Sequence, residues 1–255
     1  MNTICTCSLN GINPQLHSEA LILNDVRELP PEIQRTVVNV AARNGSRLLR
    51  TRAEGLSVSL DFELHELNAA ARLELCRYLA YWAAPGGWLT LSHRPGQRLW
   101  VTCDAPPTLT SALRWTEPIT VTFTAWEAPW WESVNVTSAT GTGRSGHVTI
   151  RPPGDQKTCL QWEITAQTTV TSLTVKTERE SIHLRNFTLP PGETLLLDYD
   201  DLRLPRLTAQ SRSYLAHRTP ESAEDLMLLP GVDNTVTWEA DGNVAVKFTA
   251  RGRYL

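Results

Sequence analysis

The sequence predicts a mainly β protein that is divided into two β-rich domains, with one α-helix in the first. Strict alternation of apolar and polar residues at Val58–Leu64 is the pattern of a half-buried antiparallel strand. Apolar spacings of three and four, which place side chains on one face of a helix, run from Leu67 to Trp82. Beyond residue 150 the apolar runs are short and separated by turns, which is typical of a β-sandwich.

The N-terminal elements are predicted to be extended. An apolar cluster at Leu21–Leu23 predicts a short strand, and Pro30-Pro31 interrupts any regular element after it. A hairpin comes next, because Asn44-Gly45 separates the apolar run Val37–Val40 from Leu48-Leu49. Asn-Gly is the strongest short hairpin signal, since both residues accept the positive φ angles of a type I′ turn.

The helix and the strands that follow it complete the first domain. Asn68 is placed to cap the helix, and Pro85-Gly86-Gly87 ends it. A second hairpin is predicted from Trp88–Ser92 and Arg98–Asp104. Alternation at Ile119–Ala125 predicts one further strand.

The domain boundary is placed where the composition changes. Ser133–Gly146 is rich in Ser, Thr, Gly and Asn, which is linker or edge-strand composition. We therefore expect a first domain at 1–133, a linker or edge strand at 134–149 and a second domain at 150–255. The strands predicted in the second domain are Trp162–Ile164, Ser172–Lys176, Ser181–Leu184, Thr194–Asp198, Thr235–Glu239 and Val244–Thr249. The turns predicted between them are Pro190-Pro191-Gly192, Pro230-Gly231 and Asp241-Gly242.

The charge and aromatic content favour protein partners over nucleic acid. The 255 residues include 24 Lys and Arg against 27 Asp and Glu, a formal charge of -3, whereas a general nucleic-acid binder carries a basic excess. Only three of the basic residues are Lys, all beyond residue 150, and seven of the nine Trp lie in the first domain. Trp and Arg are enriched, and Lys depleted, at the centres of protein interfaces. A genome whose codon usage favours Arg and Trp is the alternative explanation.

Motifs for catalysis, metals and cofactors are missing from the sequence, and no membrane span or signal peptide is predicted. Gly141-x-Gly143-x-x-Gly146 matches the spacing of a dinucleotide loop, but no helix follows to bind a phosphate. Asp198–Asp201 is read as a solvated turn, with a structural cation as the other interpretation. The five cysteines are scattered without zinc-site spacing and are read as unreactive thiols: Cys5, Cys7, Cys76, Cys103 and Cys159.

The order of features resembles the distal tail (Dit) proteins of long-tailed bacteriophages over nearly the whole chain. The resemblance begins with Leu9-Asn10-Gly11-Ile12 and is densest over Leu75–Trp131, where the helix, the following hairpin and the closing strand occur in the family's order. It continues in Leu228–Val236, which is similar to the family's turn into a strand, and ends with Arg251-Gly252-Arg253-Tyr254-Leu255.

The resemblance implies an architecture and a structural role. Dit-like proteins have an N-terminal β-sandwich belt domain with one helix and a protruding hairpin, and a C-terminal galectin-like β-sandwich. Six copies form a ring that joins the tail tube protein to the tail hub, and receptor-binding proteins dock on its outer domains. The implied location is the virion tail tip, assembled in the bacterial cytoplasm. No active site, cofactor, metal, membrane or specific nucleic acid is implied.

Aromatic and apolar side chains of the first domain are the candidates for the subunit interface of such a ring. Strand addition through Thr36–Arg52, Leu56–Leu64 or Ile119–Ala125 is a second way to close it. The interface candidates are Val58, Leu60, Phe62, Trp100, Trp115, Trp126, Trp130 and Trp131.

Two competing functions come from other classes of protein. A carbohydrate-binding module for host cell-surface recognition would need an exposed Trp to stack on a sugar, and Trp162 and Trp238 are the candidates, although a strand Trp is more often part of the core. His183–Phe187 has little of the galactoside-binding pattern of a galectin, so the family's fold is expected without galactoside binding. A hydrolase has no support beyond the presence of carboxylates.

Overall fold

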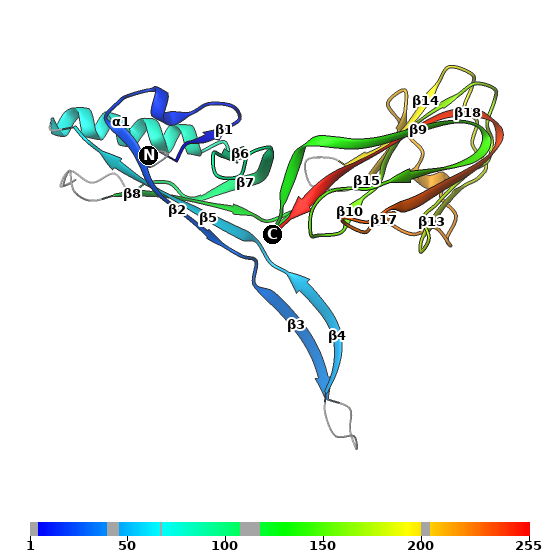
Figure 1. The fold of residues 1–255 in the computed structure, drawn as a ribbon, viewed down its shortest axis with the longest axis horizontal. Coiled ribbons are helices and arrows are strands. Elements are labelled where there is room, and N and C mark those ends of the chain that lie inside the picture. The colour runs from blue at the N-terminus through cyan, green and yellow to red at the C-terminus, as the bar shows by residue number, and fades with distance from the viewer. Residues whose placement is uncertain (1–4, 40–45, 67, 108–117, 200–204) are drawn as a thin grey trace. The chain divides into compact units, whose positions relative to one another are not determined.

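The computed structural model describes residues 5–39, 46–66, 68–107, 118–199 and 205–255, and the chain forms two compact units (Figure 1). The first unit is Met1–Trp131 with Leu255, and the second is Glu132–Tyr254. Both are built from antiparallel strands, and α1 is the one α-helix among the described residues. The predicted mainly β fold with one helix is confirmed.

The first unit holds a sheet whose strands follow the order β1-β6-β7-β8-β5-β2. A separate two-stranded sheet, β3 and β4, extends from the ends of β2 and β5 (Figure 1). The elements are β1 (Cys7–Leu9), a 3₁₀ turn (Pro14–Leu16), β2 (Leu21–Leu29), β3 (Ile33–Asn39), β4 (Ser46–Ala53), β5 (Leu56–Leu64), α1 (Ala69–Ala83), β6 (Gly87–Leu91), β7 (Gln97–Ala105) and β8 (Ile119–Ala125).

The helix begins and packs as its sequence predicts. The Asn68 side chain accepts hydrogen bonds from the backbone N–H groups of Ala70 (2.9 Å) and Ala71 (3.5 Å), which satisfies donors that have no partner inside the helix. Trp82 then packs edge-on against Phe62 of β5 and Phe123 of β8, with ring centroids 6.2 and 5.9 Å apart. These contacts fix α1 on one face of the sheet.

The second unit surrounds one hydrophobic core. Its strand order is β16-β15-β14-β11-β18-β9, and β12 pairs with both β13 and β18. The elements are β9 (Trp131–Ile150), β10 (Thr158–Cys159), β11 (Gln161–Ala166), β12 (Leu173–Lys176), β13 (Ser181–Leu184), β14 (Thr194–Tyr199), β15 (Pro205–Ala209), β16 (Arg212–Ser213), a 3₁₀ turn (Leu215–His217), β17 (Met227–Leu228) and β18 (Asn234–Tyr254). The interval predicted as a linker or edge strand, 134–149, is strand along its whole length.

The turn predicted at Asp241-Gly242 does not form, because β18 continues through it. The Asp241 carboxylate instead accepts hydrogen bonds from the backbone N–H groups of Thr171 (2.9 Å) and Ser172 (3.2 Å). Gly242 lies so close to the Thr169 carbonyl oxygen that a Cβ would collide with it. Asp-Gly therefore lies inside the strand, where it accommodates the close approach of a neighbouring loop.

Candidate interaction surface

The β3–β4 hairpin has two chemically different faces. Residues paired across an antiparallel ribbon project to the same side, and successive residues alternate between sides. Val37 pairs with Leu48, and Ile33, four residues earlier on the same side, pairs with Ala53. The register shifts between Thr36 and Val37, which leaves Leu49 as an extra residue of β4. Arg35, which pairs with Thr51, lies between these two apolar pairs on the same side. This face therefore carries two apolar pairs with Arg35 between them, and we call it the apolar face.

The opposite face carries positive charge. Arg47 pairs with Val38, Arg50 with Thr36 and Arg52 with Gln34. None of the three arginines forms an ion pair with a residue in the described part of the chain. We call this side the arginine face, and its guanidinium groups are free for planar hydrogen bonding to an acidic partner.

The apolar face is open to solvent. The exposed fractions of Val37 and Leu48 are 56% and 53%, and Ile33, Leu49 and Leu29 at the root are exposed to a similar degree. Several exposed apolar side chains gathered on one strand pair are typical of an interaction site. β3 and β4 pair only with each other among the described residues, so their outer edges also present backbone groups for strand addition.

A network of polar contacts holds the root of the hairpin at Glu28, near the end of β2. One carboxylate oxygen accepts from His93 Nε2 (2.7 Å) and Arg94 Nε (3.1 Å). The other lies 2.8 Å from Arg94 Nη2 and accepts from Trp131 Nε1 at 3.1 Å. Burial alone would raise the pKa of the Glu28 carboxyl, but the hydrogen bonds and charges of Arg94 and His93 hold it below its ordinary value. A charged carboxylate thus ties β2 to the β6–β7 turn and to Trp131.

Three of the predicted interface residues lie in the core of their own unit. Val58, Leu60 and Phe62 are fully buried, since β5 pairs with β2 on one side and β8 on the other. β8 is likewise an inner strand between β5 and β7, so neither β5 nor β8 has an edge for strand addition. As far as the described residues show, the hairpin is the one segment of the three whose strands have unpaired outer edges.

The predicted tryptophans fall into different environments. Trp131 is buried, and its indole nitrogen donates to Glu28. Trp100 packs edge-on against Trp88, and Trp130 is partly buried. Trp126 is 57% exposed, with its Nε1 3.3 Å from Asp104. Trp115 lies outside the described residues.

The two candidate sugar-stacking residues are core residues. Trp162 and Trp238 are 1% and 4% exposed, so neither ring offers a face to a sugar. His183 is also held structurally, since Nδ1 lies 3.1 Å from Thr174 Oγ1 and Nε2 lies 2.9 Å from Ser181 Oγ. The Trp residues predicted for the carbohydrate alternative therefore do not form a binding platform.

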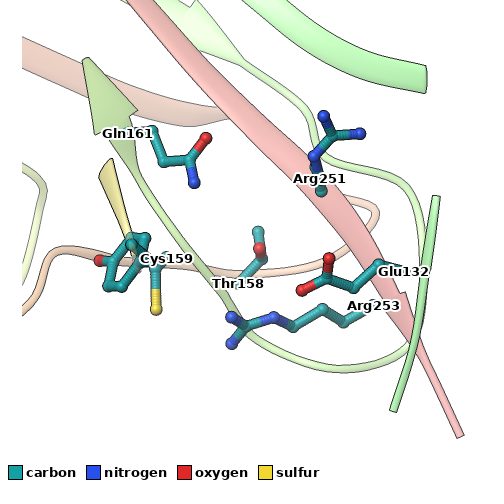
Figure 2. A pocket seen from close by; sticks show the side chains of 7 residues that line it. Glu132, Thr158, Cys159, Gln161, Arg251 and Arg253 are labelled. Carbon is teal, nitrogen blue, oxygen red and sulfur yellow. The ribbon is translucent and has the colours of Figure 1, made fainter. Parts of the chain in front are cut away.

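A small polar cavity is lined by residues of the second unit (Figure 2). Arg251 and Arg253 of β18 line it together with Glu132, Cys159 and Tyr199. Its volume of about 30 Å³ has room for about one water molecule, which is too little for a substrate. Arg251 Nη1 donates to the Ser133 carbonyl at 3.2 Å. This hydrogen bond, at the edge of the cavity, links the start of β9 to the end of β18.

Metal-ligand clusters and membrane-spanning helices were sought among the described residues. No group of three or more His, Cys, Asp or Glu side chains in the described ranges is arranged to hold a metal ion. The predicted acidic cluster is only partly described, and its Asp198 is paired with Arg206 at 2.7 Å. No helix in this part of the chain has the length and hydrophobicity to cross a bilayer.

Comparison with known proteins places the fold. No family model and no curated protein matches the sequence. The crystal structure of the Dit protein of phage SPP1, described as a paradigm of hub adsorption apparatus in phages infecting Gram-positive bacteria, matches with a TM-score of 0.71. The identity is 11%, and the match covers 98% of this chain and 99% of that one.

Baseplate structures of phage P2 in the activated conformation match as well. The form with Ca gives a TM-score of 0.53 at 9% identity and 98% coverage of both chains. The form with Sr gives 0.52 at 9% identity and 97% coverage of both chains. At these identities the likeness establishes the fold, and the resemblance found in the sequence is confirmed at that level. The galectin-like character of the second domain stays a prediction.

Proposed function

We propose that this chain is a structural component of a bacteriophage tail tip, of the distal tail type. The observation that carries the proposal is that both units, in order and over nearly the whole chain, correspond to the SPP1 Dit protein. A match that included one unit alone would support only a shared β domain. The role is structural and not enzymatic, and the chain works through its surfaces.

The proposed assembly is a ring of six copies that joins the tail tube protein to the tail hub. A closed ring uses a heterologous interface, in which one patch of a subunit meets a different patch of its neighbour. The hairpin suits one half of such an interface, because it combines the exposed apolar face with free strand edges. Receptor-binding proteins are proposed to dock on the second unit.

The experiment that tests the ring measures the mass of the purified chain by light scattering, with electron microscopy of the same sample. We expect a species of six times the 28.5 kDa chain mass and ring-shaped particles. A mass of one chain at every concentration, with no rings on mixing with a tail hub protein, would overturn the proposal.

Matched variants locate the contact on the hairpin. Val37→Ser with Leu48→Ser removes two apolar side chains from the apolar face, and we expect assembly to weaken at least tenfold. Val38→Ser makes the same kind of change on the arginine face and serves as the control. Equal effects of the two changes would show that the apolar face is not the contact.

A further inference from the structure

Three side chains far apart in the sequence meet beside the N-terminal strand. Cys5 precedes β1, His93 lies in the turn after β6, and Glu28 lies near the end of β2. β1 pairs with β6, and the Ser92 N–H donates to the Thr6 carbonyl at 2.9 Å, which brings residues 5 and 93 together. Cys5 Sγ is 3.6 Å from His93 Nδ1, and His93 Nε2 is 2.7 Å from Glu28 Oε1.

The order of these contacts is that of a thiol, a base and a group that orients the base. The Glu28 carboxylate accepts the hydrogen bond, so the proton of the neutral imidazole is assigned to Nε2. Nδ1 then turns its lone pair toward the Cys5 thiol. Because the hydrogen bonds and charges of Arg94 and His93 lower the Glu28 pKa against the effect of burial, the carboxylate that orients the ring stays charged.

The thiol also has a hydrogen-bond donor and access to solvent. The Ser92 hydroxyl lies 3.6 Å from Cys5 Sγ and donates to it. Cys5 is partly exposed, and the His93 side chain is 44% exposed. The Cys5 sulfur therefore has an O–H donor and an imidazole beside it, in a place that a small molecule can reach.

At the other four cysteines burial is the dominant influence on the thiol, and it outweighs the charges of Arg253 near Cys159 and Arg72 near Cys76. Burial raises the pKa of the Cys7 thiol to about 12 and also raises the pKa values of Cys76, Cys103 and Cys159. Cys159 has Met227 Sδ as a neighbour at 3.5 Å, and no imidazole lies within hydrogen-bond distance of any of the four among the described residues. Their thiols are held in the protonated, unreactive form.

We propose that Cys5, His93 and Glu28 form a nucleophilic thiol site that exchanges with disulfides. His93 Nδ1 takes the proton from the Cys5 thiol, and the thiolate attacks one sulfur of a disulfide. That S–S bond breaks as the new one to Cys5 forms, and the departing thiolate takes the proton from the imidazolium. Cys5 is oxidised and the departing sulfur is reduced. The site goes beyond the structural role proposed above and does not depend on it.

The test follows the reaction of the folded chain with dithiodipyridine, an uncharged disulfide, and identifies the labelled cysteine by peptide mass. The reference is the same chain unfolded in denaturant at the same pH. Exposure alone cannot make a folded thiol faster than an unfolded one, so a faster native rate reports activation. We expect Cys5 to react about tenfold or more faster in the folded chain.

Variants separate the thiol from its base. Cys5→Ser should remove the fast phase, and Cys103→Ser, the matched control, should leave it unchanged. His93→Gln keeps a hydrogen-bonding side chain without a basic nitrogen, and the Cys5 rate should fall to the unfolded value or below, with a changed pH profile. Far-ultraviolet circular dichroism confirms that each variant is folded. A fast phase that survives Cys5→Ser, or a native Cys5 rate no higher than the unfolded one, would overturn the proposal.

Discussion

The Trp131 indole nitrogen donates a hydrogen bond to the Glu28 carboxylate across 3.1 Å, although the two residues are 103 positions apart. Trp131 is the first residue of β9, and Glu28 is the penultimate residue of β2, just before the hairpin. The Arg94 guanidinium also lies 5.0 Å from the centre of the Trp131 ring. The last residues of the first unit and the base of its hairpin are thus held by one carboxylate.

Removing that carboxylate should destabilise the first unit. Glu28→Ala leaves the donors of three residues, His93, Arg94 and Trp131, without their acceptor in a partly buried place, and we expect a loss of about 2–3 kcal/mol in the free energy of unfolding. Denaturant unfolding measures this loss. Glu74→Ala is the matched control, because its pair with Arg77 is exposed and contributes little. Equal losses would show that the Glu28 network is not structural.

The same carboxylate makes stability depend on acid pH. Its pKa in the folded protein lies below the ordinary value of 4.5. The stabilisation is therefore fully present above that value and is lost as the pH falls through the folded-state pKa. We expect the unfolding free energy to decline below about pH 4.5 less steeply in Glu28→Gln than in the unmodified protein. Parallel pH profiles for the two proteins would contradict this assignment.

The helix cap can be tested by a pair of substitutions. Asn68→Ala removes the acceptor for two backbone N–H groups at the start of α1, and we expect a loss of about 1 kcal/mol. Asn68→Asp keeps an acceptor there and should retain most of the stability. Thermal unfolding of both variants measures the difference, and an Asp variant as unstable as the Ala variant would contradict capping.

The close approach at Gly242 should not tolerate a side chain. Gly242→Ala places a Cβ against the Thr169 carbonyl, and we expect a loss of about 1–3 kcal/mol from overpacking. Gly192→Ala is the comparison, since its surroundings are open and its φ of +86° makes the cost one of backbone strain alone. Chemical unfolding ranks the two, and a smaller loss at Gly242 would count against the collision.

The sequence predicted secondary structure better than it predicted which surface each buried face packs against. The alternation at Val58, Leu60 and Phe62 correctly indicates one buried face of a strand. An alternating pattern indicates that one face of a strand is removed from solvent. Burial in the core of the same domain and burial against another subunit both remove apolar surface from solvent, so the pattern does not distinguish them. The pattern therefore could not show that these residues lie in their own core while Val37 and Leu48, with equally apolar side chains, are exposed.

Contacts between distant residues were beyond the sequence pattern. Cys5 and His93 are 88 positions apart, and no spacing rule joins them. They meet because β1 pairs with β6, and a pairing register depends on tertiary packing. The Asp241-Gly242 signal failed for a related reason, because a turn dipeptide and a close backbone approach both favour glycine.

The two faces of the hairpin have a consequence for how the protein survives between synthesis and assembly. A free strand pair with an apolar side is a template on which further chains can stack into aggregates. Arg47, Arg50 and Arg52 on the other side repel such stacking, since each added copy would bring like charges together. The hairpin thus carries charged residues that oppose aggregation next to its exposed apolar face. High salt screens the repulsion between these charges, so we expect the newly synthesised chain to aggregate at high salt.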